Sequence, residues 1–270
     1  MTLQPRIRFD HVRKDFDTEG GKLTAIEDLS LTVHDGEFIS VIGPSGCGKT
    51  TMLNMIAGFQ QPSAGSLTLD GRPIAKPGSD RGVIFQDYGV FPWLTVRDNI
   101  GFGLTLRANR VGPAQREEIV ARYLELMGLT RFADAYPKTL SGGMRQRVAL
   151  ARAYAVKSEF LLMDEPFGAL DAQTRTAMQN LLLEALRSEG KTVFLITHSV
   201  EEALYLSSRV VVVTARPARI RTIIDVPFTG PRHEELHRAP EFVQMQYDLR
   251  EMVMREYAMQ ESMRDQQTVQ

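Results

Sequence analysis

Residues 43–50, Gly-Pro-Ser-Gly-Cys-Gly-Lys-Thr, have a spacing suited to holding phosphate groups. They lie between an apolar run, residues 38–42, and a helical pattern at residues 51–57. The glycines let backbone N–H groups converge at a helix N-terminus, Lys49 neutralises β/γ-phosphate charge, and the Thr50 hydroxyl can bind Mg²⁺. A chance glycine-rich turn would not need the flanking strand and helix. The predicted phosphate-binding residues are Gly43, Pro44, Ser45, Gly46, Cys47, Gly48, Lys49, Thr50 and Thr51.

Two adjacent carboxylates, Asp164 and Glu165, follow the apolar run at residues 160–163. This places them at the carboxyl edge of a predicted sheet, where ligands bind in open α/β folds. We expect Asp164 to hold the magnesium shell, and Glu165, one residue further out, to orient or deprotonate the attacking water. The alternative is an acidic turn without a chemical role.

Gln86 and His198 also follow predicted strands. The amide oxygen of Gln86 can reach Mg²⁺ or water, although alone it would mean nothing. A lone histidine is more often structural than catalytic. Because both residues accompany a phosphate loop and a carboxylate pair, we predict that both act in catalysis, with Gln86 also a metal ligand.

A second glycine-containing helix start lies at residues 140–147, Leu-Ser-Gly-Gly-Met-Arg-Gln-Arg. Ser141 is a good N-cap, Gly142 and Gly143 allow close backbone approach, and the positive helix end favours a phosphate. An ordinary helix start explains the serine but not two adjacent glycines. The sequence therefore contains two phosphate-binding patterns about a hundred residues apart.

Residues 233–237, His-Glu-Glu-Leu-His, match a zinc metalloprotease pattern. That site requires a continuous helix that places both imidazoles on one face. Pro231 and Pro240 leave little room for such a helix, and Arg232 and Arg238 would oppose a dication. We therefore expect a solvated, irregular segment here and no zinc site.

The elements that must position these residues are of two kinds. Alternating runs at residues 7–9, 29–33 and 66–70 predict an antiparallel sheet near the N-terminus. Nearly continuous apolar runs at residues 38–42, 160–163, 193–197 and 210–214 predict parallel strands buried on both faces. Helical patterns separate these runs, so the fold class is α/β.

Helical patterns also fill the rest of the chain. One helix follows Asp171 and stops near Gly190, and another starts at a capping box formed by Ser199 and Glu202. Residues 91–158 predict helices without intervening strands, which indicates a helical insertion. An amphipathic stretch at residues 242–253 precedes a polar tail, residues 264–270, for which we expect disorder.

Composition limits the class of protein. The 270 residues are 43% hydrophobic, enough for a sizeable core, and Lys+Arg 32 against Asp+Glu 33 gives a net charge of -1. This balance does not favour nucleic acid as a partner. The single cysteine, Cys47, excludes an internal disulfide and favours a reducing compartment. We see neither a leader peptide nor a membrane span, so work at a membrane would require a partner.

These motifs, in this order, resemble the ATP-binding subunit of ABC transporters up to about residue 227. The resemblance implies a P-loop NTPase (ABC cassette) with a mostly parallel core sheet, an N-terminal antiparallel β subdomain and an inserted helical subdomain. We expect an ATP-binding domain at residues 1–230, with the helical subdomain at about 88–158. Residues 231–270 would form a C-terminal helical extension and flexible tail.

The resemblance also implies residue roles. Phe16 would stack on adenine, residues 140–146 would be the signature, and His198 the switch histidine. Asp171 would close the D-loop, residues 168–171. In this family two subunits pair head to tail, and Ser141, Gly142 and Gly143 of one would contact the γ-phosphate held by Lys49 of the other. Met144 stands where the signature usually has glutamine, which removes one polar contact toward that nucleotide.

The implied function is ATP hydrolysis with Mg²⁺ in a transporter. Residues 81–104 look most like the importer branch for nitrate, sulfonates, taurine and similar anions. Partners would be a second copy, transmembrane permease subunits and, indirectly, a solute-binding protein, at the cytoplasmic face of the inner membrane. The alternative is a soluble ABC ATPase of DNA repair or translation, but long coiled coils or a second cassette are missing. The apolar cluster at residues 90–93 contacts the permease or fills the helical insertion, and the sequence favours neither.

Overall fold

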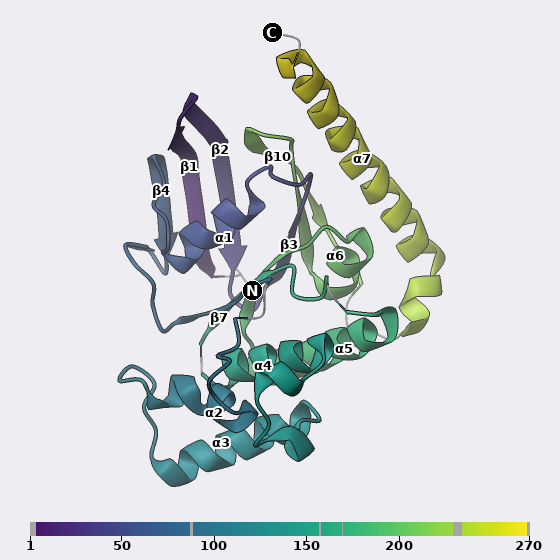
Figure 1. The fold of residues 1–270 in the computed structure, drawn as a ribbon. Helices are drawn as coiled ribbons and strands as arrows, with labels where there is room; N and C mark the ends of the chain where they lie inside the picture. The colour runs from purple at the N-terminus through teal and green to yellow at the C-terminus, as the bar shows by residue number, and fades with distance from the viewer. Residues whose placement is uncertain (1–3, 87–88, 157, 169, 229–233, 269–270) are drawn as a thin grey trace. The chain divides into compact units, whose positions relative to one another are not determined.

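The computed structural model describes residues 4–86, 89–156, 158–168, 170–228 and 234–268. The chain divides into two compact units, which are described separately (Figure 1). Unit 1 contains Met1–Pro77 and Thr192–Gln270, and unit 2 contains Gly78–Lys191.

The sheet of unit 1 combines antiparallel and parallel strands, as predicted. Its strands are β1 (Pro5–Thr18), β2 (Gly21–His34), β3 (Phe38–Ile42), β4 (Ala64–Leu69), β5 (Arg72–Pro73), β8 (Thr192–Ile196), β9 (Arg209–Val213) and β10 (Ala218–Asp225). Their order is β5-β4-β1-β2-β10-β9-β3-β8. Strand β1 pairs antiparallel with β2 and β4, whereas β3 pairs parallel with β8 and β9. Every residue of β3 and β8 is buried, as their apolar runs predict.

Strand β10 was not predicted from the sequence. It pairs antiparallel with β9 and parallel with β2, so it joins the two kinds of strand in unit 1. Its exposure alternates along the chain from the buried Ala218 to the exposed Asp225. This alternation is expected of a strand with one covered face.

The helices of unit 1 are α1 (Lys49–Ala57), α6 (Val200–Leu206), the short 3-10 helix η4 (Glu234–Arg238) and α7 (Pro240–Thr268). Helix α6 starts at the predicted cap, because the Ser199 hydroxyl accepts from the Glu202 N–H at 3.2 Å. Helix α7 is 29 residues long and extends almost to the C-terminus of the chain (Figure 1).

The expected disorder of residues 264–270 is wrong as far as Thr268, which is the last residue of α7. Residues 269–270 lie outside the described part. No glycine or proline follows Pro240, and glutamine, glutamate, arginine and methionine are good helix formers. The polar residues after 263 therefore extend α7, because their types favour helix although they are not apolar.

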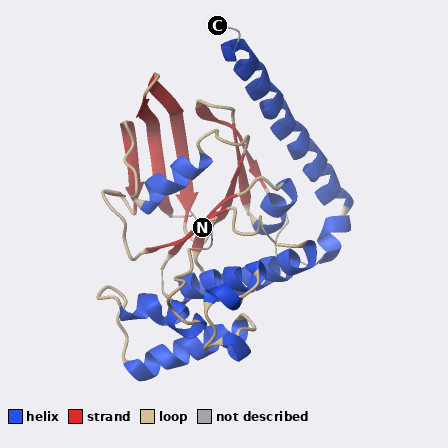
Figure 2. Ribbon diagram, viewed as in Figure 1, coloured by secondary structure: helices blue, strands red, loops and turns tan. Residues whose placement is uncertain are grey.

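Unit 2 is mostly helical (Figure 2). Its elements are β6 (Arg81–Ile84), α2 (Val96–Gly101), η1 (Phe102–Thr105), α3 (Pro113–Leu126), η2 (Thr130–Phe132), η3 (Pro137–Thr139), α4 (Gly142–Ala155), β7 (Phe160–Asp164) and α5 (Ala172–Glu189). Strands β6 and β7 pair in parallel. Within the described residues between 91 and 158 there are helices and no strand, which confirms the prediction. The buried face of α3 consists of Val120, Tyr123 and Leu124.

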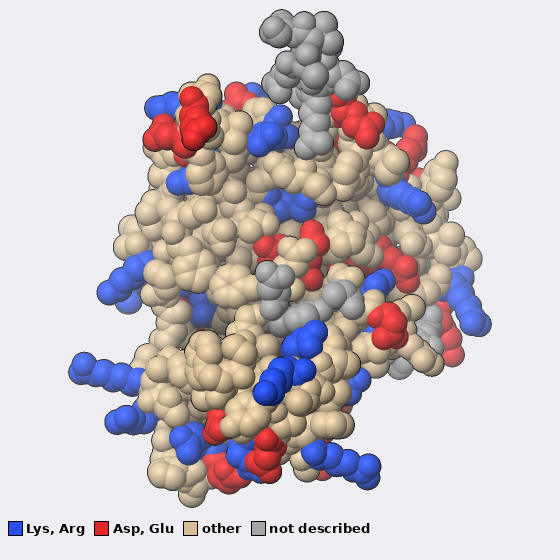
Figure 3. All heavy atoms as spheres, in the orientation of Figure 1, with Lys and Arg blue, Asp and Glu red and all other residues tan. Residues whose placement is uncertain are grey.

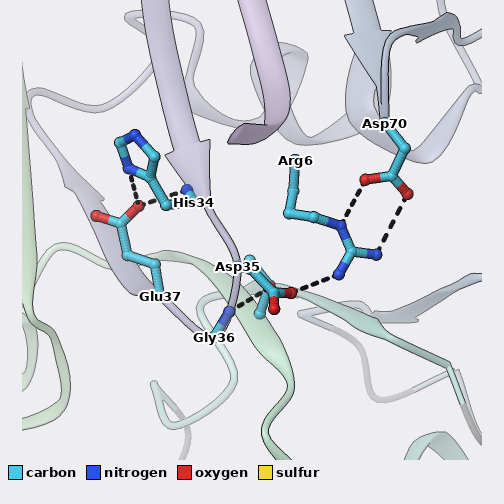
Figure 4. Close-up of polar contacts among 7 residues, drawn as sticks. Arg6, His34, Asp35, Gly36, Glu37 and Asp70 are labelled. Carbon is cyan, nitrogen blue, oxygen red and sulfur yellow. Dashed lines mark hydrogen bonds and ion pairs between the residues drawn. The ribbon is translucent and has the colours of Figure 1, made fainter. Parts of the chain in front are cut away.

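Ion pairs in unit 1 fix the turn that leads into β3 (Figure 4). Arg6, at the start of β1, pairs with Asp35 in the turn between β2 and β3 and with Asp70 after β4. Glu37, 8% exposed, pairs with Arg209 at 3.2 Å. These contacts matter because β3 carries the phosphate loop. Elsewhere charges of both signs are interspersed over the face in Figure 3, in keeping with the small net charge.

Candidate nucleotide-binding site

The predicted phosphate loop connects β3 to α1 in unit 1, as the motif requires. Lys49 is the first residue of α1 and is 7% exposed. Its ammonium group donates to the carbonyl oxygens of Gly43 and Pro44, each at 2.8 Å. The positive charge is therefore held inside the curve of the loop, where a phosphate would be attracted. Ser45, Gly46 and Thr50 are exposed.

Two glycines of the loop are required by the geometry. A Cβ atom at Gly43 would lie 2.6 Å from Val213 Cγ2 and 2.7 Å from the Val213 carbonyl oxygen, so the loop touches the end of β9. Gly48 has φ 117, which L side chains rarely adopt, and a Cβ there would lie 3.1 Å from the Ala25 carbonyl oxygen. The loop is therefore set closely between β2 and β9.

The side chain of Cys47, which belongs to the phosphate loop, is fully buried. Burial raises the pKa of its thiol, and the Lys49 ammonium only partly opposes this effect. A position near a helix N-terminus favours a thiolate, but desolvation is the larger effect here. Cys47 is a small residue that fills space.

Phe16 and His198 are the other predicted site residues in unit 1. Phe16 lies on β1 opposite Leu23, is half-buried, and has the Lys14 ammonium 5.0 Å from its ring centroid. His198 follows β8 and is exposed. Next to it, Thr197 Oγ1 accepts from the Ser199 N–H at 3.0 Å and bonds Glu202. That network fixes the backbone on either side of the imidazole.

The carboxylate pair lies at the end of β7 in unit 2, as predicted. Asp164 is the last residue of β7 and is 9% exposed. Glu165 is half-buried and has φ 47, a left-handed conformation that is unfavourable for glutamate. Strained backbone of this kind gathers at functional sites, because neighbouring structure must hold it in place. The two carboxylates therefore have different environments, as their predicted roles require.

The signature segment starts α4 in unit 2. The Ser141 hydroxyl accepts from the Met144 N–H at 3.3 Å, which confirms the predicted N-cap. A Cβ atom at Gly143 would lie 3.3 Å from Thr174 Cγ2 and 3.4 Å from Leu170 Cδ2, so this glycine allows close packing in unit 2. Gln146 is fully buried. Ser141 is exposed and residues 142–145 are half-buried, so this part of the segment is accessible to another molecule, whereas Gln146 is not.

Asp171 caps α5, and its carboxylate accepts from the Thr174 N–H at 2.9 Å. The backbone hydrogen bond from Thr174 lowers the pKa of this carboxyl group. Arg175 fixes the same turn by donating to the Leu170 carbonyl oxygen at 2.8 Å. Asp171 is exposed, so its side chain is accessible to a second molecule even while it caps α5.

Gln86 is exposed, two residues after β6 ends at Ile84. The neighbouring residues 87–88 lie outside the described part. Downstream, an aromatic cluster forms from Phe91, Trp93 and Phe102. The centroid of the Phe91 ring is 5.5 Å from that of Trp93 and 4.6 Å from that of Phe102. Trp93 is 69% exposed, so it does not fill the core of the insertion, whereas Phe91 is half-buried.

Sequence reasoning missed two residues that hold this cluster. Asn99 is fully buried and bonds the Phe91 backbone twice, accepting from its N–H at 2.8 Å and donating to its carbonyl oxygen at 3.1 Å. Arg152, near the end of α4, lies 4.7 Å from the Phe91 ring centroid and donates to the Gly89 carbonyl oxygen at 2.6 Å. Neither belongs to a sequence motif that predicts these contacts.

Within the His-Glu-Glu-Leu-His pattern of residues 233–237, His237 makes packing contacts inside unit 1. Residues 234–238 form η4, so the expected irregular segment was wrong there; His233 lies outside the described residues. The His237 ring stacks on Tyr205 at 4.6 Å, and its Nδ1 lies 3.2 Å from Glu201 Oε1. Across the described positions, no group of three His, Cys, Asp or Glu residues is arranged to hold a metal ion.

The predicted site residues are thus divided between the units. Phe16, residues 43–51 and His198 belong to unit 1, whereas Gln86, residues 141–143, 164–165 and 171 belong to unit 2. Magnesium prefers oxygen ligands, which Thr50, Gln86 and Asp164 could supply. In the described parts of the chain, no helix is long and apolar enough to cross a membrane.

Comparisons with known proteins agree with the motifs. Residues 26–168 match the family described as ABC transporter. The chain is 49% identical over 230 residues to an uncharacterized ABC transporter ATP-binding protein of Methanocaldococcus jannaschii, covering 85% of each. It is 44% identical over 254 residues to the nitrate import ATP-binding protein NrtD of Synechococcus elongatus, covering 93% of each.

A solved structure supports the fold and the chemistry. The ATP-binding cassette MJ0796, in a dimeric post-hydrolysis state bound to ADP and Pi, superposes with a TM-score of 0.73 at 29% identity. The match covers 83% of this chain and 100% of that one. With a P-loop between β3 and α1, the chain belongs to the ABC transporter family and is an ABC-type ATPase that binds nucleotide.

Proposed function

We propose that the chain is the ATP-hydrolysing subunit of an importer for a small anion, with nitrate as the first candidate. The observation that carries this proposal is the 44% identity to NrtD, which extends over 93% of both chains. Sulfonates and taurine are the other candidates from the sequence of residues 81–104. The solute itself would be chosen by a solute-binding protein and a membrane channel.

The site residues have separate roles in this proposal. Lys49 and the N–H groups of its loop bind the β- and γ-phosphates, and Phe16 stacks on adenine. Thr50, Asp164 and Gln86 would hold Mg²⁺, which supplies charge neutralisation to the phosphates when it is bound.

The hydrolytic roles belong to Glu165 and His198. Glu165 orients the water and accepts its proton, while His198 donates a hydrogen bond to the γ-phosphate. The left-handed backbone of Glu165 supports its role, because a strained residue beside a magnesium carboxylate needs a functional reason.

We place the active form as a head-to-tail dimer that closes on ATP. Ser141, Gly142 and Gly143 of one copy then contact the γ-phosphate bound by Lys49 of the other, and the Asp171 turn lies at the same interface. Two observations support this arrangement: the capped, positively polarised start of α4, and the dimeric state of the MJ0796 cassette.

The membrane subunit binds the aromatic cluster in this proposal. Trp93 is 69% exposed and Phe102 37%, although both are large and apolar. Exposed aromatic side chains fixed by their neighbours are typical of interface anchors. The chain would therefore work at the cytoplasmic face of the membrane, bound to permease subunits.

The test is uptake by cells that lack the gene. Cells complemented with the wild-type gene should take up ¹⁵N-labelled nitrate, and cells with Glu165→Gln should not. Parallel arms measure taurine and an alkanesulfonate. Loss of taurine or sulfonate uptake alone would change the solute within the anion class, whereas no effect on any of the three would contradict the proposal.

A further inference from the structure

The C-terminal helix α7 has one buried stripe, and its composition changes along the helix. Phe242, Leu249 and Val253 are buried and apolar, and they are followed on the same face by Glu256, 1% exposed, and the half-buried Gln260. The intervals of seven, four, three and four residues keep all five on one side. Polar side chains at buried positions require partners. Both polar residues find them beside the phosphate loop.

Glu256 holds the turn between β9 and β10. Its carboxylate accepts from the Ala215 N–H at 3.1 Å and pairs with Arg221. The two ends of this turn lie against the phosphate loop. Val213 would be 2.6 Å from a Cβ at Gly43, and Ala218 Cβ would be 3.5 Å from one at Gly48. Helix α7 therefore fixes the wall on which the loop rests.

Gln260, one helical turn beyond Glu256, contacts the loop itself. Its Nε2 donates to the Ser45 carbonyl oxygen at 2.9 Å. In a planar trans peptide the carbonyl and the next N–H point in opposite directions. A Ser45 carbonyl held toward α7 therefore directs the Gly46 N–H to the other side of that peptide. Gly46 has φ 73, and the Ser45–Gly46 peptide is the central peptide of a turn in which the Cys47 N–H donates to the Pro44 carbonyl oxygen at 3.4 Å. That turn bond does not engage the Ser45 carbonyl, which bonds Gln260 instead.

We propose that Gln260 is a positioning residue for the phosphate loop, which holds the Ser45–Gly46 peptide in one orientation and so sets the affinity for ATP. The inference rests on the proposed role of residues 43–51, but it is independent of the transported solute. The neighbouring carbonyl of Pro44 is already bonded by Lys49. With Gln260 in place, the two consecutive carbonyls of the loop are both held, one by Lys49 at the start of α1 and the other by the C-terminal helix α7.

The decisive variants are Gln260→Met, which keeps the size and removes the donor, and Gln260→Glu, which replaces the donor with an acceptor. The probe is the fluorescent nucleotide mant-ATP with magnesium chloride, and ATPase kinetics and the thermal midpoint are measured on the same preparations. Loss of one neutral hydrogen bond should weaken mant-ATP binding and raise the KM for ATP about three- to tenfold. The kcat should stay within about twofold, because the bond is made in the ground state and the transition state alike.

Gln260→Glu gives a second signature. At pH 8 its carboxylate repels the Ser45 carbonyl, whereas at about pH 4 more than half of the carboxyl groups are protonated and can donate to it again. The affinity ratio between Gln260→Glu and wild type should therefore move toward one as the pH falls. Gln244→Glu is the matched control, since Gln244 lies on the exposed face of α7 and its amide donates to Asp248 Oδ1 at 2.8 Å, away from the phosphate loop. Its ratio should not change with pH.

Three results would overturn the inference. One is unchanged mant-ATP affinity in both Gln260 variants, another is an equal loss of kcat and thermal stability with no change in KM, and the third is the same pH dependence in Gln244→Glu. Lys49→Ala separates this failure from failure of the site assignment. If Lys49→Ala also binds mant-ATP normally, the phosphate loop is wrongly assigned; if it loses binding while the Gln260 variants retain it, only the role of Gln260 is wrong.

Discussion

Replacing Gly43 by alanine should displace the phosphate loop. The new Cβ would lie 2.7 Å from the Val213 carbonyl oxygen, against about 3.4 Å for an ordinary contact, so one of the two must move by roughly 0.7 Å. The oxygen belongs to the backbone of β9, which is paired on both sides. We expect Gly43→Ala to lower the free energy of unfolding by about 1–3 kcal/mol, the usual cost of overpacking, and to weaken ATP binding.

Far-UV circular dichroism during urea unfolding is the suitable assay. The only tryptophan, Trp93, lies in unit 2, so its fluorescence would not report on unit 1 directly. Gly46→Ala is the control for backbone conformation, because its Cβ meets no atom within 4 Å but its φ is 73. It should cost about 1–2 kcal/mol from the left-handed conformation alone.

A double-mutant cycle with Val213→Ala identifies the cause. Removal of Val213 Cγ2 relieves one of the two close contacts, whereas the carbonyl oxygen remains. Gly43→Ala should therefore cost at least about 0.5 kcal/mol less in the Val213→Ala background, without becoming neutral. An equal cost in both backgrounds would refute the steric explanation.

Four further predictions concern the site and its surroundings. Glu165→Gln should keep ATP binding, lose at least about a hundredfold in hydrolysis and accumulate an ATP-bound dimer in size-exclusion chromatography with light scattering; wild-type turnover would contradict the role as base. Cys47 should react with a maleimide far more slowly than free cysteine at pH 7, because it is buried and the pKa of its thiol is raised. Rapid labelling would show that the thiol is accessible. Cys47→Ala should retain ATPase activity within about twofold. Trp93→Asp should leave the thermal midpoint within a few degrees but reduce copurification with the permease subunits, whereas unfolding would indicate a core role. The pKa of the Asp171 carboxyl group is lower in the folded state than in the unfolded state. Its stabilising effect is therefore complete above the unfolded-state pKa and is lost as the pH falls through the folded-state pKa. Urea unfolding at several pH values should show that Asp171→Asn flattens the dependence of stability on pH below about pH 4.

The sequence predicted those parts of the fold that local patterns encode. Buried strands β3 and β8 were visible as apolar runs, and the helix starts at Ser141 and Ser199 as capping residues. Strand β10 was missed because its sequence, Ala-Arg-Ile-Arg-Thr-Ile-Ile-Asp, does not keep a regular alternation and because its pairing with β2 joins residues nearly two hundred positions apart. Local pattern carries no information about such a partner.

The same division holds for the candidate site. Motif spacing predicts Lys49, Asp164 and Glu165 as site residues, since the chemistry proposed for them requires fixed residue types next to strand ends, and the structure has all three next to a strand end. It could not identify Asn99 or Gln260, because their partners are backbone groups, which any residue type can offer, and the partner of Gln260 is also more than two hundred residues away. Nor could it give the burial of the Cys47 thiol, because that depends on packing that the loop sequence alone does not reveal.

The left-handed backbone at Glu165 would set stability against activity at this one position if the residue has the role proposed above. A glutamate there costs about 1–2 kcal/mol relative to relaxed backbone, and Pro166 further restricts the residue before it. Asparagine tolerates this conformation better than glutamate does but ends one methylene shorter, out of reach of a water placed for the longer side chain. Random mutagenesis selected only for thermal stability should therefore enrich inactive Glu165→Asn chains. A thermostable engineered version of this ATPase should take its gains from other positions.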